Sequence, residues 1–163
     1  MPEEVTICNT SPLLYLHLVG QLDLLPQLYG QVLIPPAVQA ELEAGAQRGV
    51  SVPMVETLSW LRVTRLASQA LLPLATDLGR GEAEVIGLGL ERPNCRLILD
   101  DALARRIARF NGLRFTGTVG VIVKAKQRGL LDAVKPVVLA LRNAGLWLSD
   151  SLVTDVLREA GEL

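Results

Sequence analysis

The chain has 163 residues, half of them hydrophobic, and a net charge of only −1 at pH 7. This size and composition suit one compact core and exclude a disordered or fibrous protein. The near-neutral net charge also excludes the overall excess of positive charge that is typical of many nucleic-acid-binding proteins. No apolar run approaches the roughly 20 residues needed to cross a bilayer, and no secretory signal is recognisable. We therefore expect a cytoplasmic protein that makes no membrane contact.

Strands and helices alternate along the chain. An apolar strand at 5–8 leads into Asn9-Thr10-Ser11-Pro12, where Thr10 or Ser11 is expected to cap a helix that ends near Gly20. A helix from Pro36 is expected to break at Gly45, before a loop at 45–53. Further strands are predicted at 31–34, 61–66, 97–99 and 113–115. Further helices are predicted at 22–28, 82–91, 102–110, 118–126, from 135 onward and after Asp150, with an extended piece at 146–148.

This alternation predicts an α/β domain with a mostly parallel sheet that helices cover on both faces. In such a sheet the loops at the carboxyl ends of the strands converge on one crevice, where ligands bind. Asn9 follows the first strand, and Asp100 and Asp101 follow the strand at 97–99. We therefore expect these three side chains to lie at the same edge.

Acidic residues gather at the ends of several predicted elements: Glu41, then Glu82 with Glu84, then Asp100 with Asp101. Carboxylates that meet at one place repel one another unless a cation is present. Oxygen ligands of this kind favour Mg²⁺ or Mn²⁺. Each residue also has a simpler explanation: a helix-start carboxylate, a helix cap, a solvated side chain or, for Asn9, a turn former. The prediction of a metal site therefore depends on the whole set.

Other residue types are less informative. Cys8 and Cys95 stand in apolar, strand-like contexts, which favours buried thiols over a disulfide or a zinc site. The few aromatic residues are scattered along the chain, so no base-stacking platform is evident. Only three basic residues precede Gly79, and the rest follow it. The later ones either contact a phosphate backbone or form a solvated helix face.

Taken together, five short motifs resemble the PIN domain, a nuclease fold found in many bacterial toxin–antitoxin ribonucleases. They are Asn9-Thr10-Ser11-Pro12-Leu13, Ala40-Glu41-Leu42, Gly81-Glu82-Ala83-Glu84, Leu99-Asp100-Asp101 and Thr116-Gly117-Thr118. The resemblance is strongest to a branch of uncharacterised, predicted nucleic-acid-binding PIN-like proteins. It implies a single PIN-like domain over residues 1–163, built as a three-layer α/β/α sandwich.

The resemblance also implies a role for each matching residue. Glu41, Glu82 and Asp101 take the places of catalytic acidic residues. Asn9 and Asp100, with the same three residues, are the expected ligands for Mg²⁺ or Mn²⁺, with polar support from Thr10, Ser11 and Thr118. Independently of the resemblance, Arg80, Arg105 and Arg106 in the more basic later part of the chain are the candidates for nucleic-acid contacts. Asn9 departs from the pattern, because active members usually have aspartate there. An asparagine offers an oxygen but no charge, so weaker metal binding is expected.

Two functions stay open at this stage. The first is a metal-dependent endoribonuclease that cuts single-stranded RNA, as the toxin of a pair with an antitoxin protein, and that forms a homodimer. The second is a catalytically weakened module that binds nucleic acid or protein without cutting. A phosphate-handling enzyme of another kind has no support, because neither a P-loop nor a dinucleotide-binding glycine pattern is present.

Overall fold

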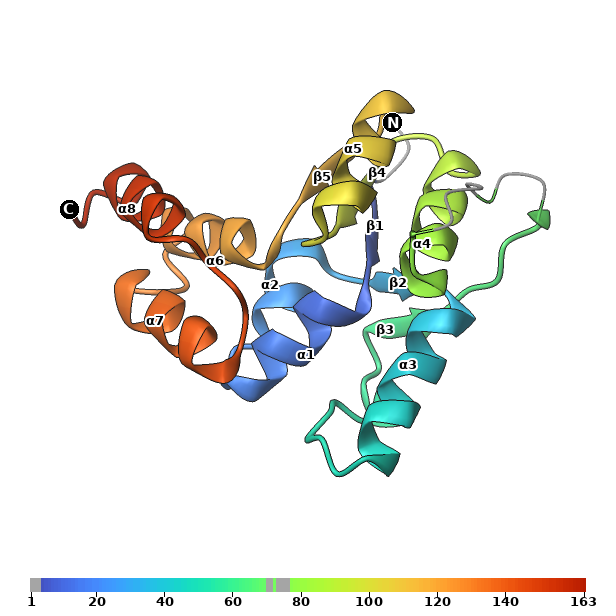
Figure 1. The fold of residues 1–163 in the computed structure, drawn as a ribbon, viewed down its shortest axis with the longest axis horizontal. Helices are drawn as coiled ribbons and strands as arrows, with labels where there is room; N and C mark the ends of the chain where they lie inside the picture. The colour runs from blue at the N-terminus through green and yellow to red at the C-terminus, as the bar shows by residue number, and fades with distance from the viewer. Residues whose placement is uncertain (1–3, 70–71, 73–76) are drawn as a thin grey trace.

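The computed structural model describes residues 4–69, 72 and 77–163, and within these a parallel sheet of five strands forms the centre (Figure 1). The strand order is β3-β2-β1-β4-β5. β1 is the central strand and pairs with β2 on one side and β4 on the other. The bounds are β1 (Val5–Cys8), β2 (Val32–Ile34), β3 (Leu61–Val63), β4 (Cys95–Ile98) and β5 (Arg114–Thr116). The predicted α/β fold with a mostly parallel sheet is confirmed.

Helices cover both faces of this sheet. The bounds are α1 (Thr10–Leu18), α2 (Leu24–Tyr29), α3 (Pro36–Gln47), the short 3₁₀ helix η1 (Val55–Thr57), α4 (Arg80–Leu90), α5 (Ala102–Phe110), α6 (Thr118–Gln127), α7 (Lys135–Ala144) and α8 (Asp150–Glu159). α4 contacts β1 and β4, whereas α2 contacts β2 and, on that side, also α6. Figure 1 shows α4 on one side of β1, and α2 with α6 on the other. The result is the predicted three-layer arrangement.

The core follows from the residues that the central strands supply. Ile7 and Cys8 of β1 and Leu97 and Ile98 of β4 are all fully buried, so these strands are apolar on both faces. Strands of a parallel sheet that helices cover on both sides have this continuous apolar character. Cys8 is a free thiol, and burial raises its pKa, with the negative charge of Asp100 as the second cause. The structural interpretation of the cysteine is confirmed.

The start of α1 differs from the prediction. Asn9, not Thr10 or Ser11, is the N-cap residue, and its side chain makes no capping hydrogen bond. The hydroxyl groups of Thr10 and Ser11 instead donate to the carboxylates of Glu41 and Asp100. Tertiary hydrogen bonds have therefore replaced the local cap that the sequence favoured.

Four further boundaries differ from the prediction. α3 does not break at Gly45 but continues to Gln47. Gly45 is buried, and a Cβ added to it would stand 3.4 Å from Val52 Cγ1. The third strand ends at Val63 rather than 66, although the Thr64 N–H still donates to Ile34 O at 2.8 Å. β4 begins at Cys95 because that residue pairs with Val5 of β1. The short strand β5 covers 114–116, one residue later than predicted.

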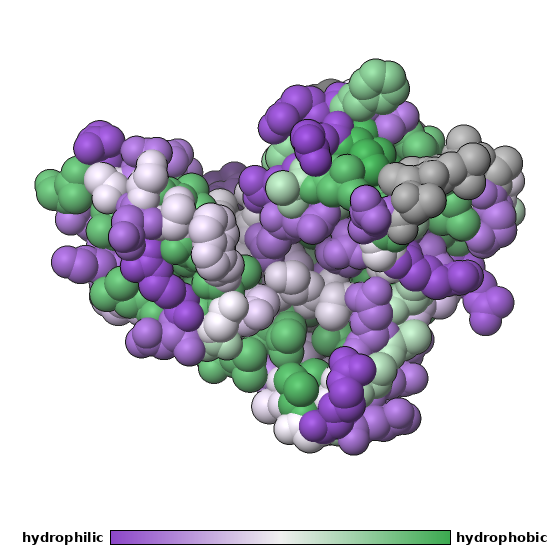
Figure 2. Space-filling model, in the orientation of Figure 1, coloured by the Kyte–Doolittle hydropathy of each residue, from purple (hydrophilic) through white to green (hydrophobic). Residues whose placement is uncertain are grey.

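The C-terminal helices α6, α7 and α8 form one side of a hollow, and α5 forms the other (Figure 2). Glu162, which follows α8, links the end of α6 to the start of α7. Its carboxylate accepts hydrogen bonds from Lys126 Nζ at 2.8 Å, Val134 N at 2.7 Å and Lys135 N at 3.0 Å. These bonds, the one from Lys126 first, lower the pKa of Glu162 to about 2. Within the described residues, every helix is too short or too polar to span a bilayer.

Candidate functional site

The candidate site lies at the carboxyl edge of the sheet, where β1 and β4 end side by side. Cys8 pairs with Ile98, so the residues that follow the two strands are brought together. A cavity of about 1180 Å³ opens at this edge. Its lining includes five polar residues that the sequence singled out: Asn9, Ser11, Glu82, Asp100 and Asp101.

Asp100 is the centre of a hydrogen-bond network at this edge. Its carboxylate accepts from Ser11 Oγ at 2.8 Å, from Thr118 N at 2.8 Å and from Thr118 Oγ1 at 2.6 Å. Thr118 is fully buried and is the first residue of α6, where the helix dipole favours a negative charge. The network therefore ties α1 and α6 to the loop after β4 and holds the Asp100 carboxylate in one orientation.

Asn9 carries a buried oxygen that has no hydrogen-bond partner. The residue is 2% exposed, and its Oδ1 finds no donor in the part of the chain that the structure describes. A buried acceptor without a partner costs about 1–3 kcal/mol, so such atoms are rare. Asn9 also belongs to the lining of the cavity, so this oxygen without a partner lies at the cavity wall.

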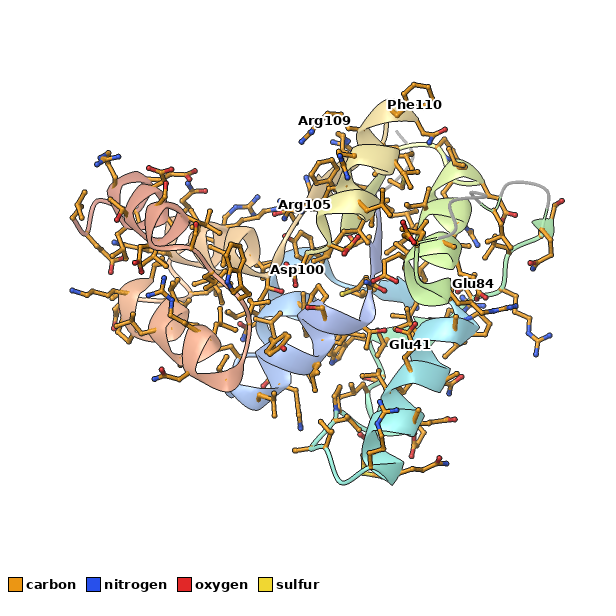
Figure 3. All side chains as sticks on the ribbon, viewed as in Figure 1. Glu41, Glu84, Asp100, Arg105, Arg109 and Phe110 are labelled. Carbon is orange, nitrogen blue, oxygen red and sulfur yellow. The ribbon has the colours of Figure 1, made fainter. Side chains whose placement is uncertain are left out.

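Glu41 lies apart from this cavity, on the side where α3 meets α4 (Figure 3). Both of its carboxylate oxygens are engaged, one by the Thr10 hydroxyl and the other by Gly81 N at 3.1 Å. Because Thr10 directly follows Asn9, Glu41 is linked to the site through α1. In this arrangement it positions the start of α1 and of α4 and does not itself face the cavity.

The two glutamates of α4 point in different directions, as expected for positions two apart on a helix. Glu82 stands in the first turn and lines the cavity. Glu84 is buried, accepts from Ala37 N at 3.1 Å and forms an ion pair with Arg80 Nε at 3.0 Å. Glu84 therefore joins α3 to α4, and only Glu82 belongs to the cavity.

Asp101 caps α5, because its Oδ2 accepts from Ala104 N at 2.9 Å. The helix-cap interpretation is thus confirmed for Asp101, while Asp100 has the different network described above. Asp101 is also exposed and lines the cavity, so the cap does not remove it from the site.

The structure separates the three arginines that the sequence assigned to nucleic acid. Arg80 pairs with Glu84 and lies outside the cavity lining, and Arg106 is exposed on α5 and also lies outside it. Arg105 does line the cavity. Its Nε donates to Leu99 O at 2.7 Å, and its guanidinium lies 5.3 Å from the centre of the Phe115 ring.

Three further cations line the cavity that the sequence analysis did not single out: Arg96, Lys124 and Arg128. Arg96 and Lys124 lie 5.5 Å and 4.5 Å from the centre of the Tyr29 ring. Partial burial lowers the pKa of Lys124, and the positive charges of Arg96 and Arg128 lower it further. Glu4 pairs with Arg96 at 3.0 Å but is shared with Arg114. The only sequence signal for these three cations was that Arg96 lies among the apolar residues of β4.

The lining of the cavity therefore combines acidic and basic side chains. Among the described residues, no three Cys, His, Asp or Glu side chains lie close enough to hold a metal by themselves. Mg²⁺ does not require such a cluster, because it keeps several waters and binds through one or two carboxylates plus substrate phosphates. The unpartnered oxygen of Asn9 and the carboxylates of Glu82, Asp100 and Asp101, which line the same cavity, are a donor set of this oxygen-only kind. The residues present fit a hard divalent cation.

The contact between Gly81 and Glu41 gives a test of how the site is positioned. A Cβ on Gly81 would stand 2.7 Å and 2.8 Å from the two carboxylate oxygens of Glu41. We expect Gly81→Ala to displace that carboxylate and lower the free energy of unfolding by about 1–3 kcal/mol in urea titrations. Glycine to alanine in a helix normally stabilises, so Gly45→Ala in α3 serves as the control and should be neutral or stabilising. Equal effects of the two changes would contradict the role of Glu41.

Comparison with known proteins agrees with the fold. A family model described as a PIN domain matches residues 5–162, which is nearly the whole chain. No curated protein matches the chain.

Proposed function

Because the chain belongs to the PIN domain family, which has a nuclease-type fold, we propose that it is a metal-dependent endoribonuclease acting on single-stranded RNA. PIN domains generally use divalent metal ions. The observation that carries the proposal is the buried, unpartnered Oδ1 of Asn9, which shares one cavity with Glu82, Asp100 and Asp101. The carboxylates that line this cavity would bind a cation, and its basic side chains would bind a phosphodiester.

In this proposal, Asn9 and Asp100 hold Mg²⁺ or Mn²⁺, together with Glu82 and Asp101. A metal held there would supply the chemistry of lowering the pKa of a water and stabilising negative charge on the phosphate. Ser11 and Thr118 keep the Asp100 carboxylate oriented through the hydrogen bonds given above. The Glu82 carboxylate makes no side-chain hydrogen bond with the described residues and is suited to accept the proton of an attacking water.

The cations of the cavity supply the contacts to the RNA backbone. Arg105 lies beside Asp100, since a Cβ on Gly117 would stand 2.9 Å from Asp100 Oδ1 and would contact the Arg105 guanidinium. It is therefore placed to contact the phosphate that is cut. Arg96, Lys124 and Arg128 line the same cavity and would bind flanking phosphates independently of sequence.

By family resemblance, the protein would act in the cytoplasm as the toxin of a toxin–antitoxin pair, bind an antitoxin protein and form a homodimer. A second function is favoured by one specific observation. Asn9 adds no charge, and Asp100 already accepts three hydrogen bonds from the protein. Weak metal binding of this kind would suit a module that holds nucleic acid or protein without cutting it.

Cleavage of a mixed single-stranded RNA pool with and without Mn²⁺ distinguishes the two functions. We expect Mn²⁺-dependent cleavage by the wild type, and a loss of about a hundredfold or more in Glu82→Gln because the proton acceptor is removed. Glu56→Gln, an exposed carboxylate in η1, is the matched control and should cleave like the wild type. Absence of cleavage in excess Mn²⁺, or full activity of Glu82→Gln, would overturn the nuclease proposal. RNA binding without cleavage would support the second function.

A further inference from the structure

Trp147 is a large aromatic side chain that the fold leaves in solvent. It is 83% exposed, although its neighbours Leu146 and Leu148 are both buried. This alternation is that of an extended segment, in which successive side chains point to opposite sides. Residues 146–148 join α7 to α8 and belong neither to a helix nor to the sheet.

The backbone that carries Trp147 is fixed on both sides. Leu146 N donates to Leu141 O at 3.1 Å, after Gly145 has turned the chain in the left-handed conformation at φ 114°. Arg142 Nη2 donates to Leu148 O at 2.8 Å and also pairs with Asp150 at 3.1 Å. Trp147 is therefore held in solvent by a rigid support and is not part of a loose loop.

The side chain lines the same cavity as the catalytic candidates. Leu152 and Val156 of α8 lie in that lining with it and give this wall an apolar surface. Lys124 and Arg128 belong to the lining as well, so the apolar wall shares the cavity with positive charge. Figure 2 shows this side of the molecule hollowed between the C-terminal helices and α5.

We propose that Trp147 stacks on an unpaired base of the nucleic acid, while Lys124 and Arg128 bind the neighbouring phosphates. This inference rests on the proposed function and adds to it how a single strand is chosen over a duplex. Every base has a π-face that an exposed indole can cover, whereas a duplex hides those faces within its stack. Cations that line the same cavity as an exposed aromatic ring complement a strand that alternates bases with phosphates, which favours nucleic acid over an apolar protein segment as the occupant.

The scattered aromatic residues of the sequence gave no sign of such a platform, because the fold creates it. Phe110 offers the matched control, since it is even more exposed, at 91%, but lies at the end of α5 outside the cavity lining. Figure 3 shows it at the outer end of that helix. A general effect of removing an exposed aromatic residue would appear equally at both positions.

The test measures binding of fluorescein-labelled oligouridine by anisotropy in excess EDTA, where the metal-dependent reaction is blocked. We expect Trp147→Ala to weaken binding by about tenfold or more, Trp147→Phe to keep most of the affinity, and Phe110→Ala to leave it unchanged. A duplex of equal length should bind the wild type and Trp147→Ala equally. In a Trp60→Phe background, Trp147 is the only tryptophan, and oligouridine should quench its fluorescence.

Unchanged oligouridine binding by Trp147→Ala, or an equal loss in Phe110→Ala, would overturn the inference. So would a wild type that binds no oligouridine but captures a protein partner through Trp147. The outcome is separable from that of the proposed function. Binding that depends on Trp147 without cleavage in Mn²⁺ would remove the nuclease but keep the stacking role. Cleavage in Mn²⁺ together with an oligouridine affinity that does not change in Trp147→Ala would keep the nuclease and remove the stacking role.

Discussion

Asp100→Asn is expected to abolish RNA cleavage while the protein stays folded. The change removes the negative charge from the centre of the network, and we expect cleavage in Mn²⁺ to fall by about a hundredfold or more. The amide keeps an oxygen for Thr118 N, and its NH₂ group is able to donate to hydroxyls that rotate to accept. The free energy of unfolding should therefore change by less than about 1 kcal/mol.

Asp100→Ala provides the contrast that makes this result interpretable. It leaves Thr118 N, in a fully buried residue, without an acceptor, and it releases both hydroxyl donors. We expect a loss of about 2–3 kcal/mol in urea unfolding, in addition to the loss of cleavage. Asp132→Asn, an exposed position between α6 and α7, should change neither quantity. A fully active Asp100→Asn would show that the network is structural only.

Asn9→Asp is expected to strengthen metal binding at the cost of stability without metal. The new carboxylate is buried and shares its cavity with Asp100, so burial and like charge both raise its pKa and oppose folding in EDTA. With Mn²⁺ present the same charge becomes a ligand. We expect Mn²⁺ affinity, measured by calorimetry, to rise by about tenfold or more.

The thermal shift gives a second measurement of the same effect. A tenfold gain in affinity adds about 1.4 kcal/mol at saturating metal, or roughly 4 °C for a domain of this size. Asn9→Asp should therefore melt below the wild type in EDTA and gain more from Mn²⁺ than the wild type does. Asn9→Ala, which removes the oxygen, should gain the least. Identical Mn²⁺ shifts in all three proteins would exclude position 9 from the metal site.

Strong local signals made part of the fold predictable. The helix at 102–110 has the predicted bounds, because Asp101 caps its start and Asn111-Gly112 ends it. Asn9 and Asp100 were expected at one edge because strands of a parallel sheet end together, and both now line one cavity. In the first case the interaction that sets the helix start lies within three residues, and in the second the shared edge follows from the parallel arrangement of the strands.

The remaining features depend on contacts that sequence spacing does not encode. Ser11 and Asp100 are 89 residues apart, and nothing local indicates that their side chains meet. Glu41 and Glu82 looked equivalent as acidic residues, yet Glu41 is engaged by Thr10 and Gly81 while Glu82 lines the cavity. Two of the cations that line the cavity, Arg96 and Lys124, come from β4 and α6, which become neighbours only through packing around Tyr29.

The position of β1 in the middle of the sheet has a consequence for how the protein folds while it is being synthesised. Its partner β2 is synthesised soon after it, but its other partner, β4, begins only at Cys95. Asp100 then lacks two of its three donors until Thr118 has been made. Chains fold from the N-terminus as they leave the ribosome, which is itself built of RNA. The proposed cutting site therefore cannot be completed until the chain has been made as far as Thr118.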